Sequence, residues 1–276
     1  MRSRWFRPRS TDDRGDVWIM GVLNCTPDSF SDGGNFINVE AAVSHGLTMW
    51  KQGARLIDVG GESTRPGAAK VSVADELKRV IPVVRRLTEL GCAVSIDTMK
   101  AEVMSQAIAA GAVMVNDVSA LGYEPESLAV VAQSGVDVCL MHMQGNPQTM
   151  QQRPQYENVV EEVSAFFTER IEAALAAGIK QSSILLDPGI GFGKRLEDNL
   201  KLIHSLETFK SRFSMPVLLG VSRKSFLGLL TGCGVDDREI ETAVAGAVGI
   251  MHGADILRVH DVKLQKRAIQ VASALS

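Results

Sequence analysis

The 276-residue sequence has little cysteine, no excess of positive charge and no long apolar segment. Its four cysteines, Cys25, Cys92, Cys139 and Cys233, form no C-x-x-C pair, which fits neither a disulfide framework nor a usual zinc site. The 29 Lys and Arg residues against 32 Asp and Glu residues leave a formal charge of −3, so no overall positive field attracts nucleic acid. No apolar run approaches the roughly 18 residues of a membrane span. We therefore expect a cytoplasmic protein with neither a nucleic-acid nor a membrane partner.

The composition and the first residues bound the domain organisation. Hydrophobic residues make up 45% of the chain and charged residues 22%, which is ordinary globular usage and excludes a disordered or low-complexity protein. The first fifteen residues, MRSRWFRPRSTDDRG, contain five arginines but lack the apolar stretch of a secretory signal. Because no Pro/Gly/Ser-rich linker follows, we expect an N-terminal arm over residues 1–15, either disordered or capping the fold, and one domain over residues 16–276.

Short apolar, β-branched runs alternate with helical patterns along the chain. Continuous apolar runs are typical of parallel strands that are covered on both faces. The eight runs are residues 17–24, 55–60, 93–97, 113–117, 136–143, 184–187, 216–222 and 256–260. The clearest helical patterns between them are residues 40–52, 75–90, 101–110 and 157–177. This alternation predicts repeated strand-helix units.

Glycines mark the ends of the helical stretches. Each lies a few residues before the next strand, where a left-handed helix cap turns the chain back: Gly53, Gly91, Gly111, Gly135, Gly178 and Gly253. Eight units in a chain of this length indicate an α/β fold of the single-domain (β/α)8 TIM-barrel type. An open doubly wound sheet is the alternative, although no nucleotide-binding fingerprint supports it.

Polar residues follow the strands, at the barrel end where chemistry is expected. They are Asn24, Asp58, Glu62, Thr64, Arg65, Asp97, Asn116, Asp117, His142, Asp187, Ser222, Arg223, Lys224, Arg258, His260 and Asp261. Any single Asp, Asn or Ser among them could simply cap a helix. Helix caps do not require cations, however, so the set as a whole indicates a binding site.

The strand-end residues divide into two chemical groups. Asp97, Asn116 and Asp187 offer acceptors and an amide to the edge of a flat polar heterocycle. The cationic group, with Asn24, suits a polyanion such as a diphosphate, and the start of a helix at the Ser-Arg-Lys-Ser segment would add anion affinity. Its members are Arg65, Lys224, Arg258 and His260. Two long loops, residues 25–38 and 61–70, are expected to act as mobile lids.

Eight motifs in order resemble the bacterial dihydropteroate synthases. They are MGVLNCTPDSFSDGG, IDVGGESTRPGA, SIDT, NDVSA, CLMHMQGNPQTMQ, LLDPGIGFGK, GVSRKSFLG and RVHDV, and they span residues 19–262. Cys25 stands where Val is common in the family and Ile190 where Phe is frequent, and neither change removes a functional group. The resemblance implies a transferase of folate synthesis, a sulfonamide target that joins 6-hydroxymethyl-7,8-dihydropterin diphosphate to 4-aminobenzoate and releases diphosphate.

The resemblance also implies residue roles. It assigns the pterin to Asp97, Asn116, Met141, Asp187, Phe192 and Lys224. It assigns the diphosphate to Asn24, Thr64, Arg65, Arg258 and His260, with Mg2+ as cofactor beside Asn24. It assigns 4-aminobenzoate to Phe30, Arg65, Pro66, Phe192, Lys224 and Ser225. The catalytic set is Lys224, Arg258, Asp97 and Asp187, and the family implies a homodimer.

Two other functions remain open from the sequence. A pterin-binding methyl-transfer module also holds a pterin between strand-end Asp and Asn residues, but it has no diphosphate to bind. The Ser-Arg-Lys-Ser segment, Arg258 and His260 therefore favour the synthase. A catalytically silent paralogue is the other alternative, because a sequence does not report turnover.

Overall fold

A computed structural model describes residues 17–26, 38–63, 67–146 and 149–275 of the chain. The expected N-terminal arm, residues 1–15, lies outside the described residues, as do most of the expected lid at 25–38 and the centre of the lid at 61–70. The domain limits of 16–276 therefore stay a prediction.

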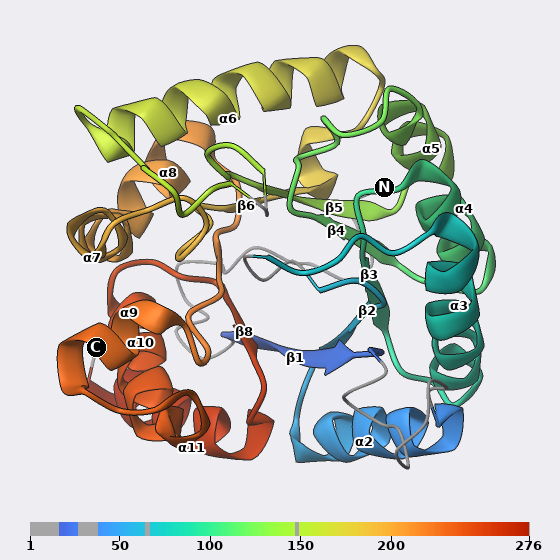
Figure 1. Ribbon diagram of the computed structural model, residues 1–276, viewed down its shortest axis with the longest axis horizontal. Helices are drawn as coiled ribbons and strands as arrows, with labels where there is room; N and C mark the ends of the chain where they lie inside the picture. Colours follow the sequence, from blue (N-terminus) through green and yellow to red (C-terminus); the bar gives the residue numbers. More distant parts are fainter. Residues whose placement is uncertain (1–16, 27–37, 64–66, 147–148, 276) are drawn as a thin grey trace.

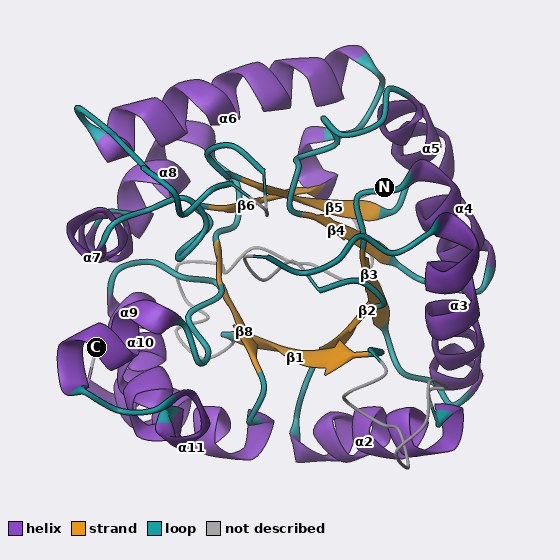
Figure 2. Cartoon of the chain, viewed as in Figure 1, coloured by secondary structure: helices purple, strands orange, loops and turns teal. Residues whose placement is uncertain are grey.

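Eight parallel strands form the inner ring of the molecule (Figure 2). They are β1 (Trp18–Asn24), β2 (Leu56–Gly60), β3 (Val94–Asp97), β4 (Met114–Asp117), β5 (Asp137–Met141), β6 (Ile184–Asp187), β7 (Leu218–Leu219) and β8 (Ile256–Val259). The hydrogen-bonded order is β6-β5-β4-β3-β2-β1-β8-β7, and an isolated parallel bridge between Leu186 and Val217 joins the two ends. The prediction of a (β/α)8 barrel is confirmed, and the open sheet is excluded.

Helices surround the strands on the outside of the barrel (Figure 1). The first half contributes α2 (Val39–Gln52), α3 (Val73–Glu89), α4 (Ala101–Ala109) and α5 (Glu126–Ser134). The second half contributes α6 (Val159–Ala176), α7 (Leu196–His204), α8 (Leu206–Phe213), α9 (Ser225–Thr231), α10 (Glu239–Met251) and α11 (Val262–Leu275), with short 3-10 turns at Gln181–Ser183 and Val235–Asp237. Among the described residues, no helix is both long and apolar enough to cross a membrane.

Strand residues alternate between two apolar layers, because successive side chains of a strand point to opposite faces. One layer fills the barrel interior with residues at or next to the starts of the strands: Met20, Leu56, Ala93, Met114, Cys139, Leu185, Leu218 and Ile256. The intervening residues, such as Ile57, Ile96 and Val115, pack outward against the helices. The interior is therefore closed by apolar side chains below, and polar side chains of the same inward set occupy its other end.

The glycines expected at helix ends have the backbone that this role requires. Gly53 ends α2 with φ of 113° and Gly135 ends α5 with φ of 68°, both in the left-handed region. The other four have φ values from 83° to 108°: Gly91, Gly111, Gly178 and Gly253. A β-carbon is unfavourable in this region, which explains why glycine recurs at the same point of each unit.

Candidate functional site at the mouth of the barrel

Strand alternation decides which strand-end polar residues face the barrel interior. Asp97 of β3 pairs in register with Asn116 of β4, and Met141 of β5 pairs with Asp187 of β6. Asp117 is out of phase with them, and its buried carboxylate accepts hydrogen bonds from the Ser119 and Leu121 backbone N–H groups. Asp117 therefore stabilises the turn after β4, whereas the in-phase residues line the mouth.

The centre of the mouth is a network around Asp58 and Arg258. Arg258 donates from Nε to Asp58 Oδ2 (2.6 Å) and from Nη2 to Asp97 Oδ2 (2.6 Å). Asn116 Nδ2 donates to the same Asp58 oxygen at 2.9 Å. Side chains from β2, β3, β4 and β8 are thus joined through one guanidinium and one carboxylate.

Burial and neighbouring charges shift the pKa values of Asp97 and Arg258 in opposite directions. Burial raises the pKa of Asp97 to about 7, although the nearby Arg258 guanidinium acts in the opposite direction. Burial lowers the pKa of Arg258, but the Asp58 and Asp97 carboxylates outweigh it and raise that pKa overall. Asp58 is fully buried, and its Oδ1 atom has no hydrogen-bond partner among the described residues. A buried acceptor without a partner is costly unless a ligand satisfies it, so the mouth suits a ligand that carries N–H groups.

Arg258 connects two groups that the sequence assigned to different ligands. The sequence placed Arg258 with the diphosphate and Asp97 with the pterin, whereas in the structure the two side chains form an ion pair. From the sequence, Asp58 was one of the polar residues expected at strand ends, but it received no ligand or catalytic role. Its place inside the buried LIDVG strand, two positions before the end, was the signal for a role at the centre of the network.

Asp187 and its loop form a second buried group. Burial raises the pKa of Asp187, and the Gly189 N–H, which donates to its Oδ1 at 2.7 Å, opposes that shift. Lys194, also buried, donates to His142 O (3.3 Å) and Phe192 O (3.0 Å) and lies 3.0 Å from His142 Nδ1. Three acceptors match the three protons of an ammonium group, so Lys194 fastens the loop after β6 to the end of β5.

The buried position of Lys194 beside His142 lowers the pKa of both side chains. Burial lowers the pKa of Lys194 to about 7. Burial, followed by the charge of Lys194, lowers the pKa of His142 to about 3. His142 is therefore neutral at physiological pH, with Nδ1 placed as an acceptor for Lys194.

Lys224 and Phe192 lie together at the edge of the mouth. The Lys224 Nζ atom is 3.9 Å from the centroid of the Phe192 ring, a cation–π arrangement. Gly191, beside Phe192, leaves room for this lysine, because a β-carbon there would lie 3.1 Å from Lys224 Cδ. An apolar ring and an ammonium group in contact can hold both a flat heterocycle and a negative charge.

His260 follows β8 on the other side of the mouth. Its Nδ1 atom is 2.9 Å from Ser222 Oγ, which also accepts the His260 backbone N–H at 3.2 Å. A neutral ring that accepts the Ser222 hydroxyl at Nδ1 carries its own proton on Nε2, and in that tautomer His260 can donate to an anion.

The remaining residues expected in the site are only partly placed. Asn24 ends β1 and Ser225 begins α9. Phe30, Thr64, Arg65 and Pro66 lie outside the described residues.

A buried ion cluster that sequence reasoning missed lies at the base of the 61–70 loop. Lys100 donates to Glu62 Oε2 (2.5 Å) and to Glu76, and Thr98 donates to Glu76 Oε1 (2.7 Å). The other oxygen of Glu62 accepts the Val71 N–H at 3.2 Å. Glu62 therefore ties the two ends of this loop to each other and to the start of α4.

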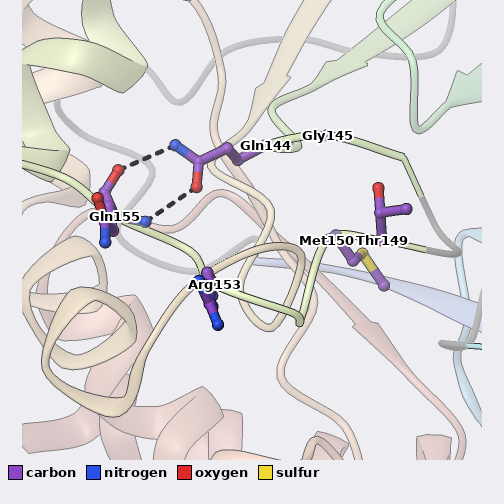
Figure 3. Close-up of a pocket in the computed structure, with 6 residues that line it drawn as sticks. All are labelled: Gln144, Gly145, Thr149, Met150, Arg153 and Gln155. Atoms are coloured by element: carbon purple, nitrogen blue, oxygen red, sulfur yellow. Dashed lines mark hydrogen bonds between the residues drawn. The ribbon is translucent and has the colours of Figure 1, made fainter.

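The loop after β5 contains a separate polar pocket of about 300 Å³ (Figure 3). Its lining residues are Gln144, Gly145, Thr149, Met150, Arg153 and Gln155. The side chain of Gln144 pairs with the backbone of Gln155 through two hydrogen bonds of 2.9 and 3.1 Å. Tyr156 Oη donates to Gly193 O at 2.7 Å, so this loop packs on the loop that carries Phe192.

Comparisons with known proteins agree with this geometry. Residues 20–260 match the family described as "Pterin binding enzyme". The chain is 48% identical to the dihydropteroate synthase of Escherichia coli strain K12 over 93% of this chain and 90% of that protein. It is 46% identical to the dihydropteroate synthase of a Synechocystis species over 94% and 90% of the two chains.

Solved structures give the same relationship. The Yersinia pestis dihydropteroate synthase, solved with a sulfonamide drug, aligns with a TM-score of 0.90 and 45% identity over 95% of each chain. The Xanthomonas albilineans dihydropteroate synthase, in complex with 7,8-dihydropteroate, aligns with a TM-score of 0.85 and 44% identity over 95% of this chain and 94% of that one. With its family match over most of the barrel and its mouth of acids, amide and cations, the chain belongs to the dihydropteroate synthase family of pterin-binding enzymes.

Proposed function

We propose that this chain transfers the pterinylmethyl group of 6-hydroxymethyl-7,8-dihydropterin diphosphate to the amine of 4-aminobenzoate. The bond between the exocyclic methylene and the diphosphate oxygen breaks, and its electron pair leaves with the diphosphate. The amine nitrogen forms the new carbon–nitrogen bond and loses one proton, which yields 7,8-dihydropteroate. The observation that carries this proposal is the Asn116–Asp58–Arg258–Asp97 network, which combines a heterocycle site with a cation at one point.

The buried acids and the amide bind the pterin ring. Asp97, Asn116 and Asp187 accept from and donate to the ring edge, while Met141 and Phe192 contact its faces. Asp58, whose Oδ1 has no partner among the described residues, orients Asn116 and Arg258 from below. Fixed polar groups of this kind hold the methylene in position without reorganisation during the reaction.

The cationic side chains bind the diphosphate leaving group. Arg258, His260 and Lys224 stabilise the charge that develops on the diphosphate, together with Thr64 and Arg65. The dihydropterin ring delocalises the positive charge on the methylene, so the neutral amine of 4-aminobenzoate needs no strong base. Phe30, Arg65, Pro66, Phe192, Lys224 and Ser225 form the 4-aminobenzoate side and exclude water that would otherwise trap the cation.

The proposed site suits a Mg2+ ion that is bound mainly by the diphosphate of the substrate. In the described part of the chain, no three His, Cys, Asp or Glu side chains gather as a metal site. Mg2+ commonly uses one or two protein oxygens, with substrate phosphates and water completing its shell. Asn24, at the end of β1, would be a protein ligand of a Mg2+ bound with the diphosphate, and the ion would supply positive charge to the leaving group.

We also propose a homodimer in the cytoplasm. The four cysteines are all free thiols, three of them buried, which suits a reducing compartment. Of the twelve large hydrophobic side chains exposed in the described residues, eight fall between residues 229 and 275. Ile240, Val244 and Met251 form one face of α10, and α10 packs beside α11 in Figure 1. An apolar face of this kind suits a second copy of the chain.

A diphosphate-release assay tests the proposed reaction. The full chain is incubated with the pterin diphosphate and Mg2+, with and without 4-aminobenzoate, and the products are identified by mass spectrometry. We expect diphosphate release that depends on 4-aminobenzoate and matches the 7,8-dihydropteroate formed. No release under any condition would contradict the proposal and would favour a silent paralogue or a methyl-transfer module.

A further inference from the structure

The turn between β7 and α9 carries Lys224 on an unusual backbone. Arg223 has φ of +58°, in the left-handed region. A residue with a β-carbon adopts this region at a cost of about 1–2 kcal/mol, and it persists where neighbouring groups hold it. In this protein those neighbouring groups come from the beginning of α10.

Three side chains at the beginning of α10 hold this turn. Thr242 Oγ1 accepts the Arg223 N–H at 3.1 Å, and Glu239 Oε1 accepts Arg223 Nε at 2.5 Å. Arg238 donates from Nη1 to the carbonyl oxygens of Arg223 (3.2 Å) and Lys224 (3.4 Å). The two main-chain carbonyls on either side of the Lys224 nitrogen and α-carbon therefore share one donor.

The Arg238 guanidinium is fixed from its other side as well. Its Nε and Nη2 atoms donate to Cys233 O at 3.4 and 3.3 Å. Gly228 in α9 faces this group, and a β-carbon there would lie 2.4 Å from Arg238 Nη2. A glycine at this position of α9 leaves the space that the guanidinium occupies.

The position of Lys224 matters for the site because its ammonium group lies against other site residues. Its Nζ atom is 3.9 Å from the Phe192 ring centroid, and its charge acts on the pKa of buried Asp187. A movement of the Lys224 backbone would displace this ammonium relative to both. Misplacement of a substrate-positioning group by about 1 Å can reduce a rate by about 100-fold.

We infer that Arg238 is a positioning residue for the 4-aminobenzoate side of the site, an inference that rests on the proposed function. It acts through the backbone of Lys224 and the adjoining Ser225 and does not itself touch substrate. Asp97 and Asn116 belong to β3 and β4, on other strands than the turn that Arg238 holds. Loss of Arg238 therefore acts mainly on 4-aminobenzoate, because the pterin diphosphate, although it also uses Lys224, keeps Asp97, Asn116, Arg258 and His260.

The test uses steady-state kinetics on four variants of the full chain. Arg238→Ala removes the donor, whereas Gly228→Ala keeps the arginine and displaces its guanidinium together with the Cys233 carbonyl that accepts from it, since a β-carbon would lie 2.8 Å from Cys233 O. The double variant combines them. Arg212→Ala is the matched control, because Arg212 also forms hydrogen-bonded ion pairs, with Glu161 on the outer helices.

We expect both single variants to raise the KM for 4-aminobenzoate about tenfold, with the KM for pterin diphosphate changed less than about twofold. Because both act on one contact, the double variant should be no worse than the more affected single variant. Should Arg238→Ala fail to fold, Arg238→Lys and Gly228→Ala carry the same comparison.

Two results separate the failure of this inference from the failure of the proposed function. An active wild-type enzyme whose variants change both KM values equally, or neither, would overturn the positioning role and leave the reaction intact. A wild-type chain with no 4-aminobenzoate-dependent turnover would overturn the reaction itself.

Discussion

At the scale of single residues, the site depends on buried charges that compensate one another. Arg258 is held by Asp58 and Asp97, and Asp58 also accepts from Asn116. In the proposed site, a pterin that binds Asp97 shares this carboxylate with the Arg258 guanidinium. A diphosphate on that pterin gives the guanidinium a further partner, so we expect binding of the two halves of the substrate to be coupled.

Substitution of Arg258 tests this coupling. Arg258→Ala should weaken the pterin diphosphate about 100-fold, because a charged hydrogen bond to a buried ligand contributes a few kcal/mol. The bare pterin should change much less, because it carries no anion for that arginine to bind. Isothermal calorimetry with both ligands measures the difference. Equal losses for the two ligands would mean that Arg258 does not distinguish them.

The pH dependence of pterin binding should report Asp97. Its pKa of about 7, raised by burial, means that the carboxylate takes up a proton as the pH falls through neutrality. An ionised carboxylate accepts hydrogen bonds from the ring N–H groups better than a protonated one. The affinity for bare pterin should therefore fall with decreasing pH, by up to about tenfold per unit below this pKa. Asp97→Asn should reduce this dependence to the part that comes from Asp187, whose pKa burial also raises, and a wild-type affinity that is constant from pH 8 to 5 would contradict the account.

The sequence identified the polar residues at strand ends better than the side chains that they contact in the structure. Asn116 and Asp187 were recognised because each ends or nearly ends a short apolar run, and their alternation with apolar residues set the inward face. Asp58 was expected at a strand end but without a role, and Lys194 was not expected in the site. Their roles depend on contacts with residues 200 and 52 positions away, which no local pattern encodes.

At the scale of elements, the loop from β6 to α7 is held by several contacts to its neighbours. Gly189 and Gly191 have φ of 69° and 80°, and Lys194 holds the loop against His142. Asn199 Oδ1 accepts the Gly191 N–H at 2.7 Å, which ties the loop to α7. The LLDPGIGFGK motif therefore builds a rigid support for Asp187 and Phe192.

Two glycines with left-handed backbones, Gly178 and Gly189, allow the cost of backbone strain to be compared with the added cost of a steric clash. At Gly178, with φ of 95°, a β-carbon meets nothing within 4 Å, whereas at Gly189 it would lie 1.9 Å from His142 O. Gly178→Ala should cost about 1–2 kcal/mol of unfolding free energy, and Gly189→Ala about 3 kcal/mol or more, since a steric clash is added. Urea denaturation measures both. Similar losses for the two variants would show that the Gly189 loop adapts freely.

The strand-helix order was predictable because each unit repeats one local signal. Apolar strands, glycine at helix ends and polar strand ends recur along the chain, and the eight expected strands all appear. The short length of β7 and the separate helices α7 and α8 were not foreseen. They depend on how the barrel closes between Leu186 and Val217, a contact set by the whole ring.

At the scale of the whole molecule, the residues that stabilise the barrel and the residues of the proposed site lie at opposite ends of its interior. Apolar side chains fill its interior at one end and polar side chains occupy the other. The outer helices cover the strands, and most of the large apolar side chains that the described helices expose lie on α9, α10 and α11. Arg238 joins this outer region to Lys224, so the proposed dimer face and the site are connected through α10.

A charge on α10 should break the proposed dimer. Ile240 and Val244 are 73% and 58% exposed, and Ile240→Asp with Val244→Asp would bury two carboxylates in an apolar interface. We expect the dimer dissociation constant to rise at least about 100-fold. Analytical ultracentrifugation should find the wild type at twice the 29.7 kDa chain mass and this variant at the chain mass. Leu175→Asp, an exposed position on α6, serves as the control, and a monomeric wild type would exclude the dimer.

The most direct test of the central claim, that the barrel mouth carries the transfer reaction, is the turnover of Lys224→Ala. Lys224 is partly exposed beside Phe192, so its replacement should leave the fold intact, as circular dichroism can verify. Loss of a cation at the developing charge should reduce the rate of 4-aminobenzoate-dependent diphosphate release about 100-fold or more. Arg212→Ala, on the outer surface, should keep the wild-type rate. A folded Lys224→Ala enzyme that turns over at a near wild-type rate would contradict the account.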